Sequence, residues 1–411
     1  MERAKTKPFV ISKKAFVNAF KEVKANKGTY GIDGQTIEGF EENLKDNLYK
    51  LWNRMSSGTY FPKPVREVSI PKKNSGTRIL GVPTVEDRIA QTVARMYFEP
   101  GVEEIFYEDS YGYRPNKSAI DAVAVTRKRC WERDWVLEID IKGMFDNINH
   151  EYLMKLVKRH SKQRWVEIYI ERWLKAPFQD KDGTVKPRES GTPQGGVISP
   201  VLANLFMHYA MDKYIADEFP AIPWARYADD AVMHCVSKGQ AEFLRDKLNE
   251  RLKKCGLELN LDKTAIVYCR RCKRKGEHDK TKFDFLGYTF RQRGARDKHN
   301  EVFTSFLPAI SDASKKRIRK EIRSWKLQLK TTWEIEDIAK MYNAKLRGWI
   351  NYYGHFYRSE VVKLMRYFND CLVKWVRRKY KHRDSWKKAK VWIWQVRTRQ
   401  KNLFAHWEMV G

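Results

Sequence analysis

Two short apolar runs that each carry aspartate constrain this chain more than any other feature. Residues 135–141 read Trp-Val-Leu-Glu-Ile-Asp-Ile, with Asp140 near the end, and residues 225–234 carry Asp229 and Asp230 between two apolar halves. β-Branched and aromatic residues in such runs predict buried strands, and the paired aspartates predict the tight turn of a hairpin. Because an unpaired carboxylate is costly to bury, we expect a strand and a hairpin that hold three carboxylates above a sheet.

Carboxylates on rigid strands match the needs of nucleotidyl transfer. That reaction uses two divalent cations roughly 3.5–4 Å apart, one to activate the attacking 3′-hydroxyl and one to clamp the triphosphate. Mg²⁺ takes oxygen ligands and keeps several waters, so two or three carboxylates are enough. Adjacent aspartates in a surface turn are usually solvated, but the apolar flanks of Asp229 and Asp230 argue against that interpretation here.

The charge balance indicates a polyanionic partner. Lys and Arg total 81 against 51 Asp and Glu, which gives a net charge of +30 and a pI near 9.7. Nucleic acid is the commonest partner of so basic a chain, and a ribosome-associated or membrane-surface protein is the alternative. The 14 Trp, 20 Tyr and 20 Phe favour a protein that packs densely and stacks on bases.

Length and composition exclude several classes. With 411 residues, 42% of them apolar, the chain is expected to form a core divided into two or three subdomains. No run of 18 apolar residues predicts a membrane span, and residues 1–14 lack the apolar centre of a signal peptide. Six scattered cysteines predict reduced thiols and a cytoplasmic location.

The first three quarters of the chain predict mixed helices and strands. Residues 14–53 have a helical pattern that a glycine-rich loop, 26–34, interrupts. Residues 65–71 and 77–80 alternate about a glycine-bearing turn and predict a β-hairpin with a basic tip. Helical patterns over 200–218 and 239–255 complete what we expect to be an α+β body.

Beyond Pro308 the pattern is helical and basic. Ser311 is a candidate N-cap, followed by an apolar stripe, and a second helix is expected across residues 341–353. The stripe consists of Ile318, Ile322, Trp325 and Leu329. Residues 374–401 hold twelve Lys and Arg with one acid, so a basic, all-helical domain is predicted from about residue 305.

Two further signals in the second half leave alternatives open. The tail contains Trp375, Trp386, Trp392 and Trp394. These rings could pack as helix core, stack on RNA bases, or divide between the two roles. Cys269 and Cys272 form a CxxC pair near His278, but a single pair among basic residues is poor support for a zinc site.

An ordered set of segments matches the motifs of one enzyme family. Tyr227-Ala228-Asp229-Asp230 resembles the YxDD box of the reverse transcriptases encoded by group II introns, and Asp140 with Phe145 resembles their first catalytic motif. Other segments are similar to further blocks of the family: Gly28 to Gly34, Ile70 to Arg88, Ser110 to Asn116, Gly191 to Pro200, Phe283 to Tyr288, and Arg347 to Tyr353. The resemblance covers nearly the whole chain.

The resemblance implies a fold and an activity. The fold is a right-hand polymerase: fingers and palm over residues 1–304, with an N-terminal extension over about 1–60, then a helical thumb and maturase domain over 305–411. The activity is RNA-directed DNA synthesis with two Mg²⁺. The implied partners are an RNA template, a DNA primer, their heteroduplex, deoxynucleoside triphosphates and structured group II intron RNA.

It also implies residue roles. Asp140 and Asp229 would be the principal metal ligands, Asp230 would support them, and Ile141 would offer its backbone carbonyl. The nucleotide would be held by five side chains: Lys72 and Arg78 at the triphosphate, Phe145 as a steric gate against the 2′-hydroxyl, Gln194 near the sugar, and Lys263 as the proton donor to pyrophosphate.

Rival functions remain. A maturase could bind and fold intron RNA without catalysis, an RNA-dependent RNA polymerase would use similar carboxylates, and a host could have adopted the polymerase for repair or defence. The intact aspartates argue against the first rival and Phe145 against the second. Because related enzymes carry paired Cys and His beyond the thumb and this sequence shows none, target cleavage is not expected.

Overall fold

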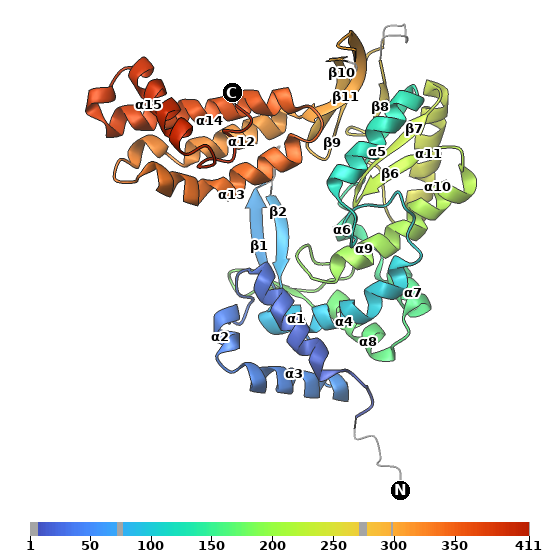
Figure 1. Ribbon diagram of the computed structural model, residues 1–411. Helices are drawn as coiled ribbons and strands as arrows, with labels where there is room; N and C mark the ends of the chain where they lie inside the picture. The colour runs from blue at the N-terminus through green and yellow to red at the C-terminus, as the bar shows by residue number, and fades with distance from the viewer. Residues whose placement is uncertain (1–6, 72–76, 271–277, 297–298, 411) are drawn as a thin grey trace. The chain divides into compact units, whose positions relative to one another are not determined.

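The computed structural model describes residues 7–71, 77–270, 278–296 and 299–410 (Figure 1). The chain forms two compact units. Unit 1 contains residues 1–118, 139–231 and 242–264, and unit 2 contains residues 119–138, 232–241 and 265–411. Lys72 of the predicted basic tip and Cys272 of the CxxC pair lie outside the described residues.

Helices form the N-terminal part of unit 1, as predicted for residues 14–53, whereas the helix over residues 85–103 was not predicted. They are α1 (Lys13–Asn26), α2 (Ile37–Glu41), α3 (Leu44–Ser57) and α4 (Val85–Glu103). The Thr84 hydroxyl caps α4 by accepting from the Asp87 amide at 3.0 Å, which satisfies one of the donors left free at a helix start.

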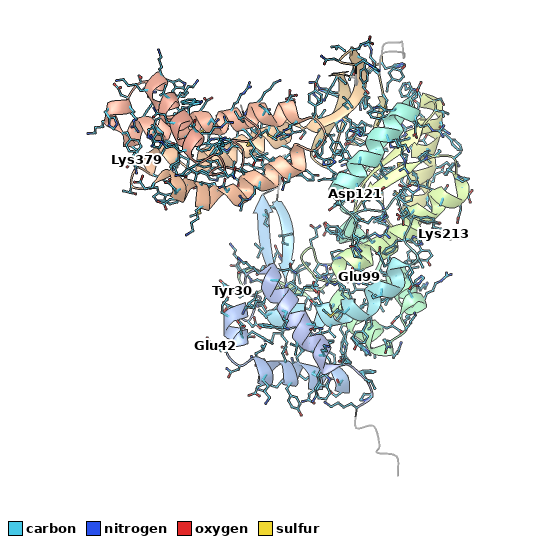
Figure 2. All side chains as sticks on the ribbon, in the orientation of Figure 1. Tyr30, Glu42, Glu99, Asp121, Lys213 and Lys379 are labelled. Carbon is cyan, nitrogen blue, oxygen red and sulfur yellow. The ribbon has the colours of Figure 1, made fainter. Side chains whose placement is uncertain are left out.

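The predicted glycine-rich loop packs against the start of α4. A Cβ at Gly31 would lie 2.6 Å from the Thr84 Cα, so only glycine allows this approach. Tyr30, labelled in Figure 2, lies under the Arg66 guanidinium at 4.6 Å from the ring centroid. Arg66 also donates to the Tyr30 carbonyl at 2.6 Å. The loop is therefore fixed to the strand β1 (Val65–Pro71), which carries Arg66.

The predicted hairpin is confirmed by β1 (Val65–Pro71) and β2 (Thr77–Val82), which pair antiparallel with Ile70 opposite Arg78. Figure 1 shows the two strands side by side beyond α1. Strands β4 (Phe178–Gln179) and β5 (Val185–Lys186) extend the sheet in the order β2-β1-β4-β5. Helices α6 (Met144–Asn147), α7 (His150–His160) and α8 (Arg164–Lys175) precede β4 in the chain.

The predicted acidic strands are also confirmed. β6 (Trp224–Tyr227), β7 (Asp230–Cys235), β3 (Trp135–Asp140) and β8 (Ala265–Tyr268) form one sheet in the order β6-β7-β3-β8. β3 and β8 run antiparallel with Leu137 opposite Ile266. Apolar burial along these strands, as at the fully buried Val136 and Val232, explains why the runs are continuous rather than alternating.

The helix predicted over residues 200–218 contains a π-helical turn that the sequence pattern does not indicate. α9 (Ser199–Met207) leads into a π-helical turn, η1 (His208–Asp212), and then into α10 (Lys213–Glu218). Arg251 of α11 (Lys238–Lys254) donates to the carbonyls of Tyr209 and Ala210 at 2.9 and 3.2 Å. A side chain from another helix therefore stabilises the widened turn.

Unit 2 contains a second antiparallel sheet that was not predicted. Its strands are β9 (Lys282–Phe285), β10 (Tyr288–Arg296) and β11 (Val302–Ile310), in the order β11-β10-β9. Phe283 and Phe290 stack with centroids 4.7 Å apart. Helix α5 (Ala119–Glu132) is anchored here because Trp131 Nε1 donates to the Phe306 carbonyl at 2.9 Å.

The rest of unit 2 is helical from residue 312. Its helices are α12 (Asp312–Ser324), α13 (Ile335–Tyr353), α14 (Arg358–Lys379) and α15 (Trp386–Arg399), with short turns η2 (Leu327–Leu329) and η3 (Lys381–Arg383). Figure 1 shows α12, α13 and α14 running alongside one another. Within the described residues, no helix is long and apolar enough to cross a membrane.

The predicted α12 stripe is confirmed except at its last member. The Ser311 hydroxyl caps the helix by accepting from the Ser314 amide at 3.1 Å, and Ile318, Ile322 and Trp325 are buried. Leu329, however, is 54% exposed. The prediction was wrong there because α12 ends at Ser324 and the left-handed backbone at Lys326 (φ 47°) breaks the helical spacing.

The tail tryptophans divide between two environments. Trp375 is fully buried, and its Nε1 donates to the Lys330 carbonyl at 2.8 Å. Trp394 is 64% exposed. One ring is therefore helix core, and the other is free to meet a partner.

This difference predicts unequal effects of substitution. Trp375→Ala should lower the free energy of unfolding by about 3–5 kcal/mol because it removes a buried ring and leaves a cavity. Trp394→Ala, the matched control, should change it by less than about 0.5 kcal/mol. Urea denaturation followed by circular dichroism measures both, and equal effects would contradict the assignment of Trp375 to the core.

Candidate active site

The three aspartates lie at corresponding ends of neighbouring strands. Asp140 is the last residue of β3. Ala228 and Asp229 form the turn between β6 and β7, and Asp230 is the first residue of β7. β7 and β3 are neighbours in the sheet. The end of β3, residues 139–140, and the start of β7, residues 230–231, both belong to unit 1, whereas the other ends of these strands belong to unit 2. The acidic ends of β3 and β7 therefore lie at the same end of the sheet.

A close backbone contact shapes the Asp-Asp turn. Ala228 has a left-handed backbone (φ 60°), which side-chain-bearing residues adopt at some cost. A Cβ at Gly112 would lie 2.4 Å from the Ala228 amide nitrogen. The Gly112 carbonyl accepts from Asn204 Nδ2 at 2.6 Å, so α9 holds the glycine against the turn.

A fully buried ion pair supports the same turn. Arg226 binds both carboxylate oxygens of Asp212, at 2.7 and 2.6 Å, and both side chains are 0% exposed. Its remaining donor contacts reach the Ala228 carbonyl at 3.1 Å, Asn204 Oδ1 at 3.0 Å and Ser110 Oγ at 2.8 Å. Burial raises the pKa of Asp212, and the Arg226 charge opposes that shift. One guanidinium thus joins the π-helical turn, α9, the Ser110 segment and the Ala228–Asp229 turn.

Asp140 has a cationic neighbour. Lys263 Nζ lies 3.2 Å from its Oδ2, and the two side chains are 64% and 29% exposed. The Asp140 carbonyl accepts from the Asn260 amide at 2.7 Å, while the buried Ile141 bridges to Leu259. The segment that carries Lys263 is therefore fixed directly to the end of β3.

Three aromatic rings link the segments around the aspartates. The Tyr113 ring centroid lies 6.4 Å from that of Phe145 and 6.3 Å from that of Tyr227. Phe145 is 7% exposed and Tyr113 is 50% exposed. Tyr113 of the Ser110–Asn116 block therefore lies next to both the predicted gate, Phe145, and the tyrosine of the YxDD segment, Tyr227.

The loop that carries Gln194 packs on α6 and on β2. The Thr192 amide donates to the Phe145 carbonyl at 2.7 Å, and the Gly81 amide donates to the Gln194 carbonyl at 2.8 Å. The Gln194 side-chain amide lies 3.1 and 3.2 Å from the two carboxylate oxygens of Asp146. Gln194 thus lies beside the predicted gate, Phe145, and its side-chain amide donates to Asp146.

Two predicted phosphate ligands are not placed in this way. Lys72 lies outside the described residues, and the side chain of Arg78 is outside them too, although its backbone pairs with Ile70. Sequence reasoning also missed Asp146, Asn204, Asp212 and Arg226. A charged Arg226 inside a buried apolar strand was the available signal, since such a group requires an acidic partner.

The donor set suits a hard divalent cation. Across the described residues, no three or more His, Cys, Asp or Glu side chains are arranged to hold a metal ion. Mg²⁺ does not require such a cage, because it binds through one or two carboxylates together with substrate phosphates and water. The carboxylates at the ends of β3 and β7 therefore fit Mg²⁺ that arrives with a triphosphate.

Aspartates at the ends of adjacent strands, in a chain with a net charge of +30, fit the class of nucleic-acid polymerases. The family model for reverse transcriptase (RNA-dependent DNA polymerase) matches residues 70–290, and the model for the group II intron maturase-specific domain matches residues 315–406. The chain belongs to the group II intron-encoded reverse transcriptases and maturases. It is an RNA-directed DNA polymerase, in a family that uses divalent metal and acts on nucleic acid.

Individual relatives support this assignment. The group II intron-encoded protein LtrA of Lactococcus lactis subsp. cremoris is 28% identical, over 82% of this chain and 68% of that protein. Protein YkfC of Escherichia coli K12 is 32% identical, over 65% of this chain and 77% of that protein. The putative COX1/OXI3 intron 1 protein of Saccharomyces cerevisiae is 27% identical, over 61% and 36%. The similarity to LtrA thus extends over most of the chain.

The contact at Gly112 generates a prediction. Gly112→Ala should reduce DNA synthesis by about 100-fold or more, because a methyl group 2.4 Å from the Ala228 nitrogen must displace the turn that carries Asp229. Gly348→Ala is the control: its Cβ meets open space in the interior of α13, so it should keep full activity and gain about 0.5–1 kcal/mol of stability. Primer extension and thermal unfolding measure both, and a fully active Gly112→Ala protein would contradict the role of this contact.

Proposed function

We propose that this chain copies an RNA template into DNA, extending a DNA primer with deoxynucleoside triphosphates and two Mg²⁺. The observation that supports this most is the position of Asp140 and the Asp229–Asp230 turn at the same end of two neighbouring strands. Carboxylates on rigid strands suit the reaction because the attacking and leaving oxygens must be aligned within a narrow range.

In this proposal Asp140 and Asp229 are the principal metal ligands, Asp230 supports them, and Ile141 contributes its backbone carbonyl. Two Mg²⁺ would lower the pKa of the primer hydroxyl and neutralise the charge that develops on the phosphates. Lys263, 3.2 Å from Asp140, partly balances the carboxylate charge in the free protein. From that position it would donate the proton that leaves with pyrophosphate.

The remaining proposed contacts bind and select the nucleotide. Lys72 and Arg78 would hold the triphosphate, Arg as a bidentate donor and Lys as a point charge. Phe145, which packs near Tyr113, would fill the space that a ribose 2′-hydroxyl needs. Gln194 would turn its amide toward the sugar.

Residues 305–411 are proposed to be the thumb and maturase domain, and residues 1–304, with their extension over about 1–60, to be the fingers and palm. Helix α12 presents exposed basic side chains: Lys316, Arg317, Arg319, Lys320 and Arg323. These side chains would bind the phosphates of a heteroduplex and of structured group II intron RNA. The affinity should fall steeply as the salt concentration rises. Cys235, Cys255 and Cys371 are free thiols, which fits a cytoplasmic location.

Removal of a proposed metal ligand gives a direct test. Asp229→Asn should lower DNA synthesis by about 100- to 10,000-fold, because several kcal/mol of transition-state stabilisation depend on the metal site. Asp217→Asn, which alters only an exposed pair with Lys213 (labelled in Figure 2), should retain activity.

Primer extension on an RNA template measures the rates, and binding of intron RNA should be unchanged in both variants. If Asp229→Asn polymerises normally, the metal-ligand assignment fails. If wild type binds intron RNA but never extends a primer, the purely maturase role is favoured instead.

The proposed gate predicts a change in sugar selection. Phe145→Ala should reduce discrimination against ribonucleotides by about 10- to 200-fold, which is the range that a few kcal/mol of steric exclusion provides. Single-nucleotide incorporation of dGTP and GTP opposite the same template base measures the ratio. Unchanged discrimination, or a wild type that accepts both sugars equally, would contradict the assignment.

A further inference from the structure

A buried guanidinium lies beside the proposed nucleotide pocket without a hydrogen-bond partner. The Arg188 nitrogens Nε, Nη1 and Nη2 are all closed off from solvent, and none of them has a hydrogen-bond partner. The guanidinium lies over the Phe178 ring, 4.0 Å from its centroid. Burial lowers the pKa of Arg188 to about 10. A ring face compensates only part of a buried charge, so this arrangement is costly in the free protein.

Asp146 is the acid whose charge acts on this guanidinium. The chain around Arg188 runs along the Asp146 segment: Ser190 Oγ donates to the Asp146 carbonyl at 3.0 Å, and Ser190 bridges to Asn149. The Asp146 carboxylate, however, lies within hydrogen-bond distance of the Gln194 amide, at 3.1 and 3.2 Å. The neutral amide of Gln194 therefore binds the Asp146 carboxylate, whereas the nearby Arg188 cation has no hydrogen-bond partner.

We propose that Arg188 is a positioning residue for nucleotide binding: when Gln194 turns its amide to the incoming nucleotide, Arg188 takes over the carboxylate of Asp146. This inference rests on the proposed contact between Gln194 and the nucleotide. The exchange replaces an amide donor on Asp146 with a charged one, and charge-assisted hydrogen bonds are roughly twice as strong as neutral ones. Nucleotide binding and neutralisation of Arg188 thereby become coupled.

An internal partner explains the geometry better than a phosphate of bound nucleic acid. The three nitrogens have almost no surface that a phosphate could reach. Asp146, by contrast, lies on the neighbouring segment, and its carboxylate becomes available once Gln194 leaves it. The proposed movement is confined to side chains, because backbone hydrogen bonds such as that from the Thr192 amide to the Phe145 carbonyl hold the loop.

The test uses Arg188→Met, which keeps contact with Phe178 but removes the charge. The melting temperature of the free protein should stay the same or rise, because an uncompensated buried charge is lost. The KM for the deoxynucleotide in primer extension should rise roughly tenfold, because the charge-assisted pair can no longer form. Affinity for template–primer should be unchanged.

Arg172→Met is the matched control. Arg172 also stacks on a ring, 3.8 Å from the centroid of Phe61, but it donates to the carbonyls of Gly58 and Tyr60. Its substitution leaves two acceptors unpaired, so the melting temperature should fall while the nucleotide KM stays unchanged. The two substitutions are thus expected to have opposite effects: Arg188→Met raises the nucleotide KM without lowering the melting temperature, and Arg172→Met lowers the melting temperature without changing the KM.

A second variant tests the pairing itself. Asp146→Asn can still accept from Gln194 but cannot neutralise Arg188, so it should raise the nucleotide KM by a similar factor. The double variant should be no worse than either single one, because both remove the same interaction. Rescue should come from Arg188→Lys, at least in part, but not from Arg188→Gln.

Four results would overturn the inference. For Arg188→Met, the first three are a lower melting temperature, an unchanged KM for the nucleotide, and a loss of affinity for template–primer. The fourth is a double variant whose increase in KM is the product of the two single increases. These results separate the inference from the proposed function. If wild type polymerises and Arg188→Met behaves like wild type, only the inference fails, whereas a wild type that incorporates no nucleotide refutes both.

Discussion

The geometry of the candidate active site depends on one buried interaction, the ion pair of Arg226 and Asp212. Both side chains are fully buried, and the guanidinium also reaches the Ala228 carbonyl, Asn204 and Ser110. Loss of either charged partner would leave the other unpaired, at a cost of about 3–5 kcal/mol. Since Ala228 directly precedes Asp229, any relaxation of this network moves the turn that carries the proposed metal ligand. The π-turn that carries Asp212 is itself held by Arg251, so the support extends to α11.

Close approaches between backbone segments provide the second constraint. Gly112 lies against Ala228, Gly191 against the carbonyl of Phe145, and Gly195 against the carbonyl of Gly81. A Cβ at any of these glycines would lie within 2.6 Å of a backbone atom, and backbone cannot move aside as a flexible side chain can. The surroundings of the candidate site are thus fixed by contacts between main-chain segments. The adjustable parts of the site are side chains such as Gln194 and Asp146, which is where we locate the response to the nucleotide.

Sequence reasoning predicted the elements whose signals are local. The apolar runs predicted β3, β6 and β7, the glycine-bearing turn predicted the β1–β2 hairpin, and Ser311 marked the start of α12. These predictions succeeded because periodicity and capping act over a few residues. The same reasoning failed at Leu329, where one left-handed residue after the helix rotates the rest of the stripe out of the core.

The sequence by itself determined where the carboxylates stand along the chain, what kind of element carries each, and how strongly basic the surface must be. Only the tertiary structure decided which distant residues meet: Ser110 with Arg226, Tyr113 with both Phe145 and Tyr227, and Lys263 with Asp140. The reason is physical. Strand and helix signals arise from neighbours in sequence, whereas a buried charge finds its partner, or like Arg188 lacks one, only once the core has packed.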